Sequence, residues 1–190
     1  MFILASASPR RRDLLVQIGA SFRVEVSEAE ELFAAEDAGG LVLANALAKA
    51  RAVAAHTGLP VLGADTVVAL DGRIFGKPAD EREACSMLAA LSGRAHEVLT
   101  GVAWVKEGRE FSTVARTQVF FAPLTEEAIA RYVKTGEPLD KAGAYAVQGR
   151  AAVFVERIEG SFSNVVGLPL HDTAELAGKA GVDLYDASGA

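Results

Sequence analysis

The chain has 190 residues, among them 19 lysines and arginines and 25 aspartates and glutamates, which give a formal net charge of −6. Proteins that coat nucleic acid are usually basic, so this charge argues against that class. No apolar stretch approaches the roughly 20 residues needed to cross a bilayer, and no basic N-terminal region precedes a long apolar core. We therefore expect a cytoplasmic protein that binds neither nucleic acid nor membranes.

The first motif follows a short apolar run. Residues 2–5 predict a strand, and Ser8-Pro9 predict the start of a helix that ends near Gly19. Arginines occupy positions 10–12, in the first helical turn, where the helix dipole disfavours each cation by about 0.3–1 kcal/mol. Two interpretations stay open: a solvated basic turn, or a phosphate site in which backbone N–H groups and guanidinium groups converge.

The remaining elements alternate between strands and helices. Strands are predicted at 22–26, 61–70, 73–75, 96–106, 109–121 and 151–158, helices at 41–56, 80–91, 126–135 and 171–180, and loops at 27–40, 136–150 and 163–170. Asp71-Gly72 and Glu107-Gly108 predict hairpin turns. Helices that alternate with strands and hairpins indicate an α/β protein with a mixed sheet, and the length predicts a single domain, residues 1–190.

Three charged residues stand out. Asp65 lies inside the apolar run 61–70, and a buried carboxylate there needs a cation or a metal, unless it lies at a strand end facing water. Gly63 leaves room for a ligand or for a neighbouring backbone. Lys49 lies on an apolar helical stretch, where it either reaches water or meets an anion. Lys77, in a glycine–proline turn after the hairpin, is either solvated or reaches back toward the strand ends.

Other reactive side chains have simpler interpretations. Cys85, the only cysteine, lies in a helical apolar pattern and is expected to be a buried, inert thiol. Trp104 is expected in the core. The histidines show no metal-ligand spacing and are expected at the surface or in packing: His56, His96 and His171. Gln148 ends a segment rich in glycine and charge, and its amide suits recognition of a nucleobase edge.

Six sequence blocks occur in order along the chain: 4–11 (LASASPRR), 63–68 (GADTVV), 76–78 (GKP), 91–98 (LSGRAHEV), 140–145 (DKAGAY) and 164–169 (NVVGLP). Together they resemble the Maf-like nucleotide pyrophosphatases, the family linked to septum formation, from residue 2 to about residue 176. The resemblance implies an elongated mixed β-sheet with flanking helices and two lobes around a central cleft, similar to the inosine triphosphate pyrophosphatases. It also implies hydrolysis of nucleoside triphosphates to the monophosphate and pyrophosphate with Mg²⁺ or Mn²⁺.

The resemblance also implies roles for single residues. It implies that Asp65, Glu31 and Lys77 are catalytic, and that Glu31 and Asp65 bind the metal ion. It implies that the phosphates are bound by Ser6, Arg10, Arg11 and Lys49. It implies that the base is selected by Arg11, Thr66 and Gln148. Arginine, threonine and glutamine at these last positions are similar to the branch that prefers dTTP and UTP. The branch that prefers 7-methyl-GTP looks different there, with tryptophan, glutamine and glutamate. Asn45 stands where the helix motif usually has leucine.

We therefore expect a metal-dependent pyrophosphatase that acts on dTTP and UTP, with CTP or modified pyrimidine nucleotides as further candidates, and that cleans the nucleotide pool. Two alternatives remain. One is a pyrophosphatase of the 7-methyl-GTP type, and the other is a nucleotide-binding regulator of septum formation that needs no turnover. The resemblance suggests a homodimer.

Overall fold

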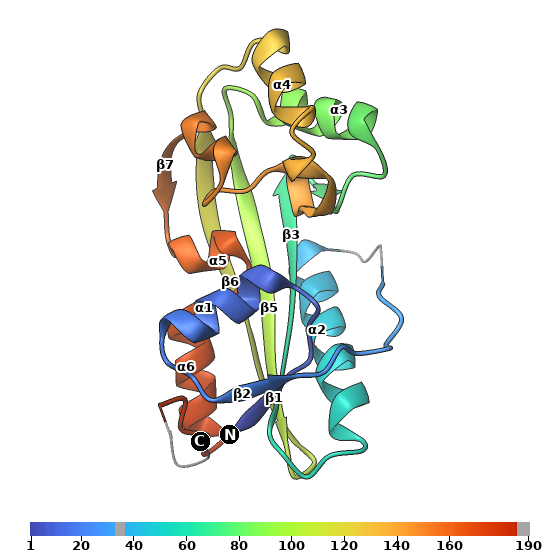
Figure 1. Ribbon diagram of the computed structural model, residues 1–190, viewed down its shortest axis with the longest axis vertical. Helices are drawn as coiled ribbons and strands as arrows, with labels where there is room; N and C mark the ends of the chain where they lie inside the picture. The colour runs from blue at the N-terminus through green and yellow to red at the C-terminus, as the bar shows by residue number, and fades with distance from the viewer. Residues whose placement is uncertain (33–36, 186–190) are drawn as a thin grey trace. The chain divides into compact units, whose positions relative to one another are not determined.

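The computed structural model describes residues 1–32 and 37–185 (Figure 1). The strands are β1 (Phe2–Leu4), β2 (Phe22–Val24), β3 (Val61–Leu70), β4 (Arg73–Phe75), β5 (Ala95–Lys106), β6 (Arg109–Phe121) and β7 (Val155–Glu159). The helices are α1 (Pro9–Gln17), α2 (Ala38–Ala54), α3 (Glu81–Leu91), α4 (Glu126–Val133), α5 (Phe162–Val166) and α6 (Leu170–Lys179). Three short 3₁₀ helices are η1 (Glu137–Asp140), η2 (Ala142–Ala144) and η3 (Arg150–Phe154).

The described strands form one mixed sheet of seven strands in the order β2-β1-β3-β5-β6-β7, with β4 paired to β3. β1 pairs in parallel with β2 and β3, whereas β4 runs antiparallel to β3 and β7 runs antiparallel to β6. This confirms the predicted α/β class with a mixed sheet and flanking helices. None of the described helices is long and apolar enough to cross a membrane.

The chain divides into two compact units. Unit 1 comprises Met1–Asp65, Thr100–Ala115 and Gly167–Ala190, and unit 2 comprises Thr66–Leu99 and Arg116–Val166. The strands β3, β5 and β6 therefore contribute residues to both units. That residues 1–190 form a single domain around a cleft stays a prediction.

In unit 1, alternate residues of β5 face different helices. Ala103 and Val105 belong to a buried cluster with Ala46, Ala50 and other residues of α2. Because successive side chains of a strand point to opposite faces, Trp104 points the other way, and its indole Nε1 donates to the Thr173 carbonyl of α6 at 3.1 Å. Trp104 is fully buried, which confirms its expected place in the core.

Glycine lets α2 lie directly against the sheet. A Cβ built on Gly63 would stand 2.2 Å from the Ala46 carbonyl oxygen, and one on Gly101 would stand 2.3 Å from the Val42 carbonyl oxygen. Both contacts are too short for any side chain, so only glycine fits at these two strand positions. The neighbour that Gly63 admits is therefore the backbone of α2, which brings this helix close to Asp65.

In unit 2, an aromatic cluster packs around β5 and β6. His96, Phe121 and Tyr145 meet edge to face, with ring centroids 4.8–5.4 Å apart. The imidazole Nε2 of His96 lies 2.9 Å from the Tyr145 hydroxyl. Burial lowers the pKa of His96 to about 4 and raises the pKa of Tyr145. His96 thus has the packing role that its sequence context predicted.

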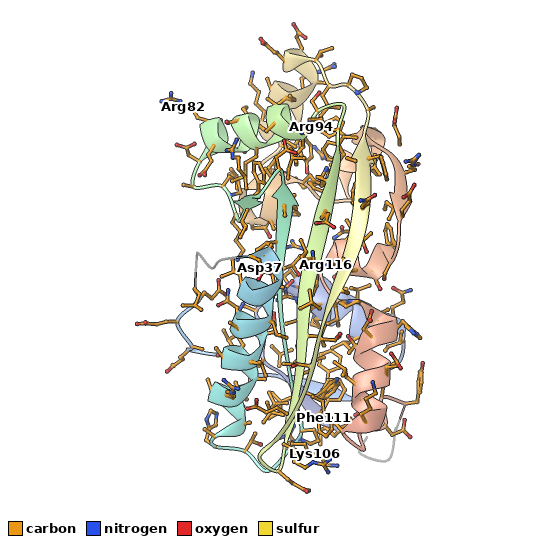
Figure 2. All side chains as sticks on the ribbon, turned by 180° about the vertical axis from the view of Figure 1, so that it is seen from behind. Asp37, Arg82, Arg94, Lys106, Phe111 and Arg116 are labelled. Atoms are coloured by element: carbon orange, nitrogen blue, oxygen red, sulfur yellow. The ribbon has the colours of Figure 1, made fainter. Side chains whose placement is uncertain are left out.

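Several predicted boundaries were wrong. Helix α2 begins at Ala38 rather than at residue 41, because the Asp37 carboxylate caps it by accepting from the Gly40 N–H at 2.9 Å (Figure 2). Residues 33–36 of the predicted loop lie outside the described residues. Residues 150–154 form η3 instead of the start of a strand, and the predicted loop 163–170 contains most of α5. Cys85 is partly exposed rather than buried.

Candidate functional site

Asp65 lies in the middle of β3, and only 14% of its side chain is exposed. Its two carboxylate oxygens meet different donors. Lys49 donates from Nζ to Oδ1 at 2.8 Å, and Asn45 donates from Nδ2 to Oδ2 at 2.9 Å. The apolar run therefore holds a nearly buried carboxylate with a compensating cation, not a carboxylate at a strand end facing water.

Lys49 joins Asp65 to a second carboxylate. Its Nζ lies 2.7 Å from Glu31 Oε1 and 2.8 Å from Asp65 Oδ1, with 11% of the lysine side chain exposed. Lys49 thus meets anions instead of reaching water, and these anions belong to its own chain. Two carboxylates and one ammonium form a single cluster, which we call the carboxylate cluster: Glu31, Lys49 and Asp65.

Sequence reasoning missed the role of Asn45 in this cluster. It is 3% exposed, and besides Asp65 it binds the backbone of Leu32, next to Glu31. The spacing of four residues from Lys49 was the available signal, because residues four apart on a helix lie on the same face. Without the fold, nothing indicated that this face meets Asp65.

The three arginines of α1 occupy three different environments. Arg12 is exposed, beside Asp13, whereas Arg11 is buried and donates from Nε to the Gly167 carbonyl at 2.8 Å. Burial lowers the pKa of Arg11, while the negative charges of Asp65 and Glu31 oppose this shift. Arg11 therefore lies within the electrostatic field of the carboxylate cluster.

Ser6 lies beside Arg11 and is nearly buried. Its Oγ accepts from Arg11 Nη1 at 3.0 Å and from the Ser8 N–H at 3.2 Å. A serine hydroxyl has two acceptor positions and one donor, so its remaining capacity is to donate. A hydroxyl held in this state suits an acceptor such as a phosphate oxygen. Arg10, one residue before Arg11, is half-buried.

The carboxylate cluster fits a divalent cation. Its two carboxylates already point one oxygen each at the same positive group, the Lys49 ammonium. Mg²⁺ in proteins is typically held by one or two carboxylates together with substrate phosphates and water, and this donor set supplies the carboxylates. Among the described residues, no group of three or more His, Cys, Asp and Glu side chains could hold a metal ion on its own. Glu31 and Asp65 would hold the ion together with substrate phosphates and water.

The other predicted residues belong to unit 2. Thr66 is half-buried on β3, and Lys77 and Gln148 are exposed in the segments that follow β4 and η2. Gly143 links these segments, because its N–H donates to the Gly76 carbonyl at 3.0 Å. Its φ of 67° lies in the left-handed region, which favours glycine. A Cβ on Gly143 would also stand 2.6 Å from a methyl group of Val68 on β3, so a larger residue would force them apart.

Glu137 holds the segment that carries Gln148, a role that sequence reasoning also missed. Its carboxylate accepts from the Arg150 N–H at 3.0 and 3.2 Å and from the Tyr132 hydroxyl at 2.9 Å. A Cβ on Gly149 would stand 2.6 Å from Glu137 Oε1. The backbone after Gln148 is therefore fixed by a side chain, while the Gln148 amide itself stays exposed.

The chain matches the family model described as "Maf-like protein" over residues 1–180. The chain belongs to the Maf family. Similar relatives named dTTP/UTP pyrophosphatase come from Symbiobacterium thermophilum (52% identity over 185 residues, 96% of this chain and 95% of the relative) and Moorella thermoacetica (53% over 187 residues, 96% of both). One from Thermococcus gammatolerans is 50% identical over 170 residues, 90% of this chain and 91% of the relative.

Two solved structures of Ham1 proteins are also similar. The one from Coxiella burnetii has a TM-score of 0.48 at 20% identity, with 81% of this chain and 92% of the other covered. The one from Staphylococcus aureus has a TM-score of 0.49 at 16% identity, with 94% and 98% covered. At these scores the likeness does not bear on the site.

In this Maf protein the carboxylate cluster comes only in part from the six sequence blocks. Asp65 comes from the block 63–68, whereas Glu31 and Lys49 lie between blocks. Ser6 and Arg11 come from the first block. The helix α2 thus brings both Lys49 and Asn45 to the aspartate of the block 63–68.

Proposed function

We propose that this Maf protein hydrolyses dTTP and UTP to the nucleoside monophosphate and pyrophosphate, with Mg²⁺ or Mn²⁺ as cofactor. The observation that carries the proposal is the convergence of Glu31 and Asp65 on one ammonium group, at 2.7 and 2.8 Å. It occurs in a chain that is 52% identical to a protein named for this activity. Paired carboxylates beside fixed cations suit the hydrolysis of a phosphoanhydride.

The proposed reaction breaks the bond between the α-phosphorus and the oxygen that bridges it to the β-phosphorus. Asp65 takes a proton from water as the water oxygen bonds to the α-phosphorus, and pyrophosphate leaves with the bridging oxygen. Among the described residues, Asn45 and Lys49 each donate to one Asp65 oxygen, and a carboxylate oxygen has a second acceptor position that can take this proton. When bound, the divalent cation supplies positive charge to the triphosphate oxygens.

The remaining residues of the proposal neutralise and position the substrate. Arg10, Arg11, Lys49 and Lys77 offset the negative charge that grows on the phosphates, and Ser6 donates its hydroxyl to a phosphate oxygen. For base choice we propose Arg11, Thr66 and Gln148. A glutamine amide offers both donors and an acceptor, which matches the edge of a pyrimidine base.

A substrate panel tests the proposal. The purified protein is incubated with dTTP, UTP, CTP, 7-methyl-GTP or ITP in Mg²⁺, in Mn²⁺ and in chelator, and pyrophosphate and monophosphate are measured. Metal-dependent release from dTTP and UTP supports the proposal. Preference for 7-methyl-GTP points to the other Maf branch, and tight nucleotide binding without release points to a regulator of septum formation.

The proposal also covers location and assembly. We propose that the protein works in the cytoplasm on small nucleotides. Its net charge of −6 argues against nucleic acid as a partner. We propose a homodimer, for which light scattering after size exclusion gives about twice the chain mass of 19.9 kDa. A mass near that of one chain contradicts it.

A further inference from the structure

Asn45 is a buried residue beside the carboxylate cluster. Its side-chain amide has no role in the proposed reaction. Asn45 lies on α2 one helical turn before Lys49. The two side chains share a helix face and hold Asp65 between them, each on a different oxygen. A buried amide needs hydrogen-bond partners, and one of the partners of Asn45 is a carboxylate of the cluster.

The hydrogen bonds of Asn45 use both ends of its amide. Nδ2 donates to Asp65 Oδ2 at 2.9 Å and to the Leu32 carbonyl at 3.0 Å, while Oδ1 accepts from the Leu32 N–H at 2.8 Å. The orientation of the amide is fixed, because the Leu32 N–H can only donate and so must face the oxygen. The Asn45 amide thus pairs with both the N–H and the carbonyl of Leu32, as the backbone of a neighbouring strand would.

We propose that Asn45 is a positioning residue for the pyrophosphatase reaction, an inference that rests on the proposed function. It orients Asp65 and fixes the backbone next to Glu31, so that both carboxylates keep one geometry around Lys49. An ammonium group is a compact charge without a fixed direction, so Lys49 alone holds the carboxylates close without orienting them. The second donor on Asp65 supplies this orientation.

Glu31 depends on the same contact. Its side chain is 44% exposed, so it is free to leave the cluster if its backbone moves. The bonds from Leu32 to Asn45 hold the adjacent residue against α2. Side chains that support catalytic or metal-binding groups in this way typically contribute about 10–100-fold to activity or metal affinity.

Three substitutions separate positioning from packing. Asn45→Leu has the same branched shape and the same number of heavy atoms, and it makes none of the three hydrogen bonds. It also introduces the residue that the helix motif usually has here, so it tests whether this chain depends on its own asparagine. Asn45→Asp keeps the shape and the bond from the Leu32 N–H, but it cannot donate to Asp65 or to the Leu32 carbonyl when ionised. Asn45→Gln keeps the amide at the end of a longer side chain. Thr173→Val is the matched control, because Thr173 is fully buried in unit 1 and its Oγ1 has no hydrogen-bond partner among the described residues.

The kinetic arm measures kcat and KM for dTTP with saturating Mg²⁺. We expect kcat to fall about 10-fold or more in Asn45→Leu and Asn45→Asp, with KM within about threefold of wild type, because the cations that bind phosphate remain. Asn45→Gln should recover part of the loss, and Thr173→Val should keep the wild-type kcat. The inference is overturned if kcat of both the leucine and the aspartate variant stays within about twofold of wild type, or if only KM changes.

A second arm does not depend on activity. Hydrogen–deuterium exchange of the Leu32 amide should be slow in wild type, faster in Asn45→Leu and close to wild type in Asn45→Asp. Equal exchange in wild type and Asn45→Leu overturns the inference. A wild-type protein that releases no pyrophosphate refutes the proposed function instead, and the exchange arm still decides whether Asn45 holds this segment.

Discussion

Replacing Lys49 with methionine removes the positive charge of the carboxylate cluster while keeping most of the side chain. In wild type the ammonium lies 2.7 Å from Glu31 and 2.8 Å from Asp65. Its loss leaves two negative groups that point at the same place. The Asn45 amide then still donates to Asp65.

The two ion pairs contribute unequally to the expected loss of stability. The Lys49–Asp65 pair has side chains that are 11% and 14% exposed, and removing one partner of such a buried pair costs about 3 kcal/mol. Glu31 is 44% exposed, so water screens its pair and its loss adds at most about 1 kcal/mol. We therefore expect Lys49→Met to lower the free energy of unfolding by about 3 kcal/mol in chelator.

Urea unfolding in chelator measures this change, with Lys179→Met as control because Lys179 is an exposed lysine of the same unit. A Mn²⁺ titration of the melting temperature adds a second readout. The cation should stabilise Lys49→Met more than wild type, because in the variant no ammonium competes for Glu31 and Asp65. A loss below about 1 kcal/mol, together with equal stabilisation by Mn²⁺ in both proteins, would refute this reasoning.

Three further predictions concern base choice, pH and the bond that is broken. Gln148→Glu should lower the ratio of dTTP to 7-methyl-GTP turnover by about 10-fold or more, and an unchanged ratio excludes Gln148 from base choice. In the folded protein, burial lowers the pKa of His96 from 6.5 to about 4. Between these pH values the unfolded chain binds a proton that the folded chain does not bind. The free energy of unfolding therefore decreases by up to about 3 kcal/mol as pH falls from 6.5 to 4. His96→Gln should flatten this part of the urea-unfolding profile, and a profile as steep as that of wild type contradicts the argument. In ¹⁸O-labelled water, dTMP should carry the label; label in pyrophosphate would place the attack on the β-phosphorus.

The sequence predicted correctly those turns and helices that are determined by a few neighbouring residues. The residue pairs Asp71-Gly72 and Glu107-Gly108 predicted hairpin turns. In the structure both residues of each pair have a positive φ, 51° and 75° in the first pair and 50° and 73° in the second, as such turns require. Helix α3 follows from its cap, since the Asp80 carboxylate accepts from the Glu83 N–H at 2.8 Å. The start of α2 was missed because two glycines follow its first residue, and glycine is a poor helix former.

The residues of the carboxylate cluster could be singled out from the sequence, but their arrangement could not. Asp65 was singled out by an apolar strand and Lys49 by an apolar helix, yet nothing in either pattern indicates that they meet. Their meeting depends on Gly63, which admits the backbone of α2. A glycine in a strand indicates that another group packs closely against it, but only the fold shows that this group is the backbone of α2. The role of Asn45 was missed for the same reason, because its partners are 13 and 20 residues away.

Replacement of Asp65 with asparagine tests the central claim most directly, because it removes the proton acceptor and keeps the shape of the side chain. The measurement is pyrophosphate release from dTTP in Mg²⁺ by wild type, Asp65→Asn and the exposed control Asp71→Asn. We predict that Asp65→Asn loses at least about 100-fold in kcat while remaining folded, and that Asp71→Asn matches wild type. Asp65→Asn turnover within about threefold of wild type would contradict a catalytic role for this carboxylate.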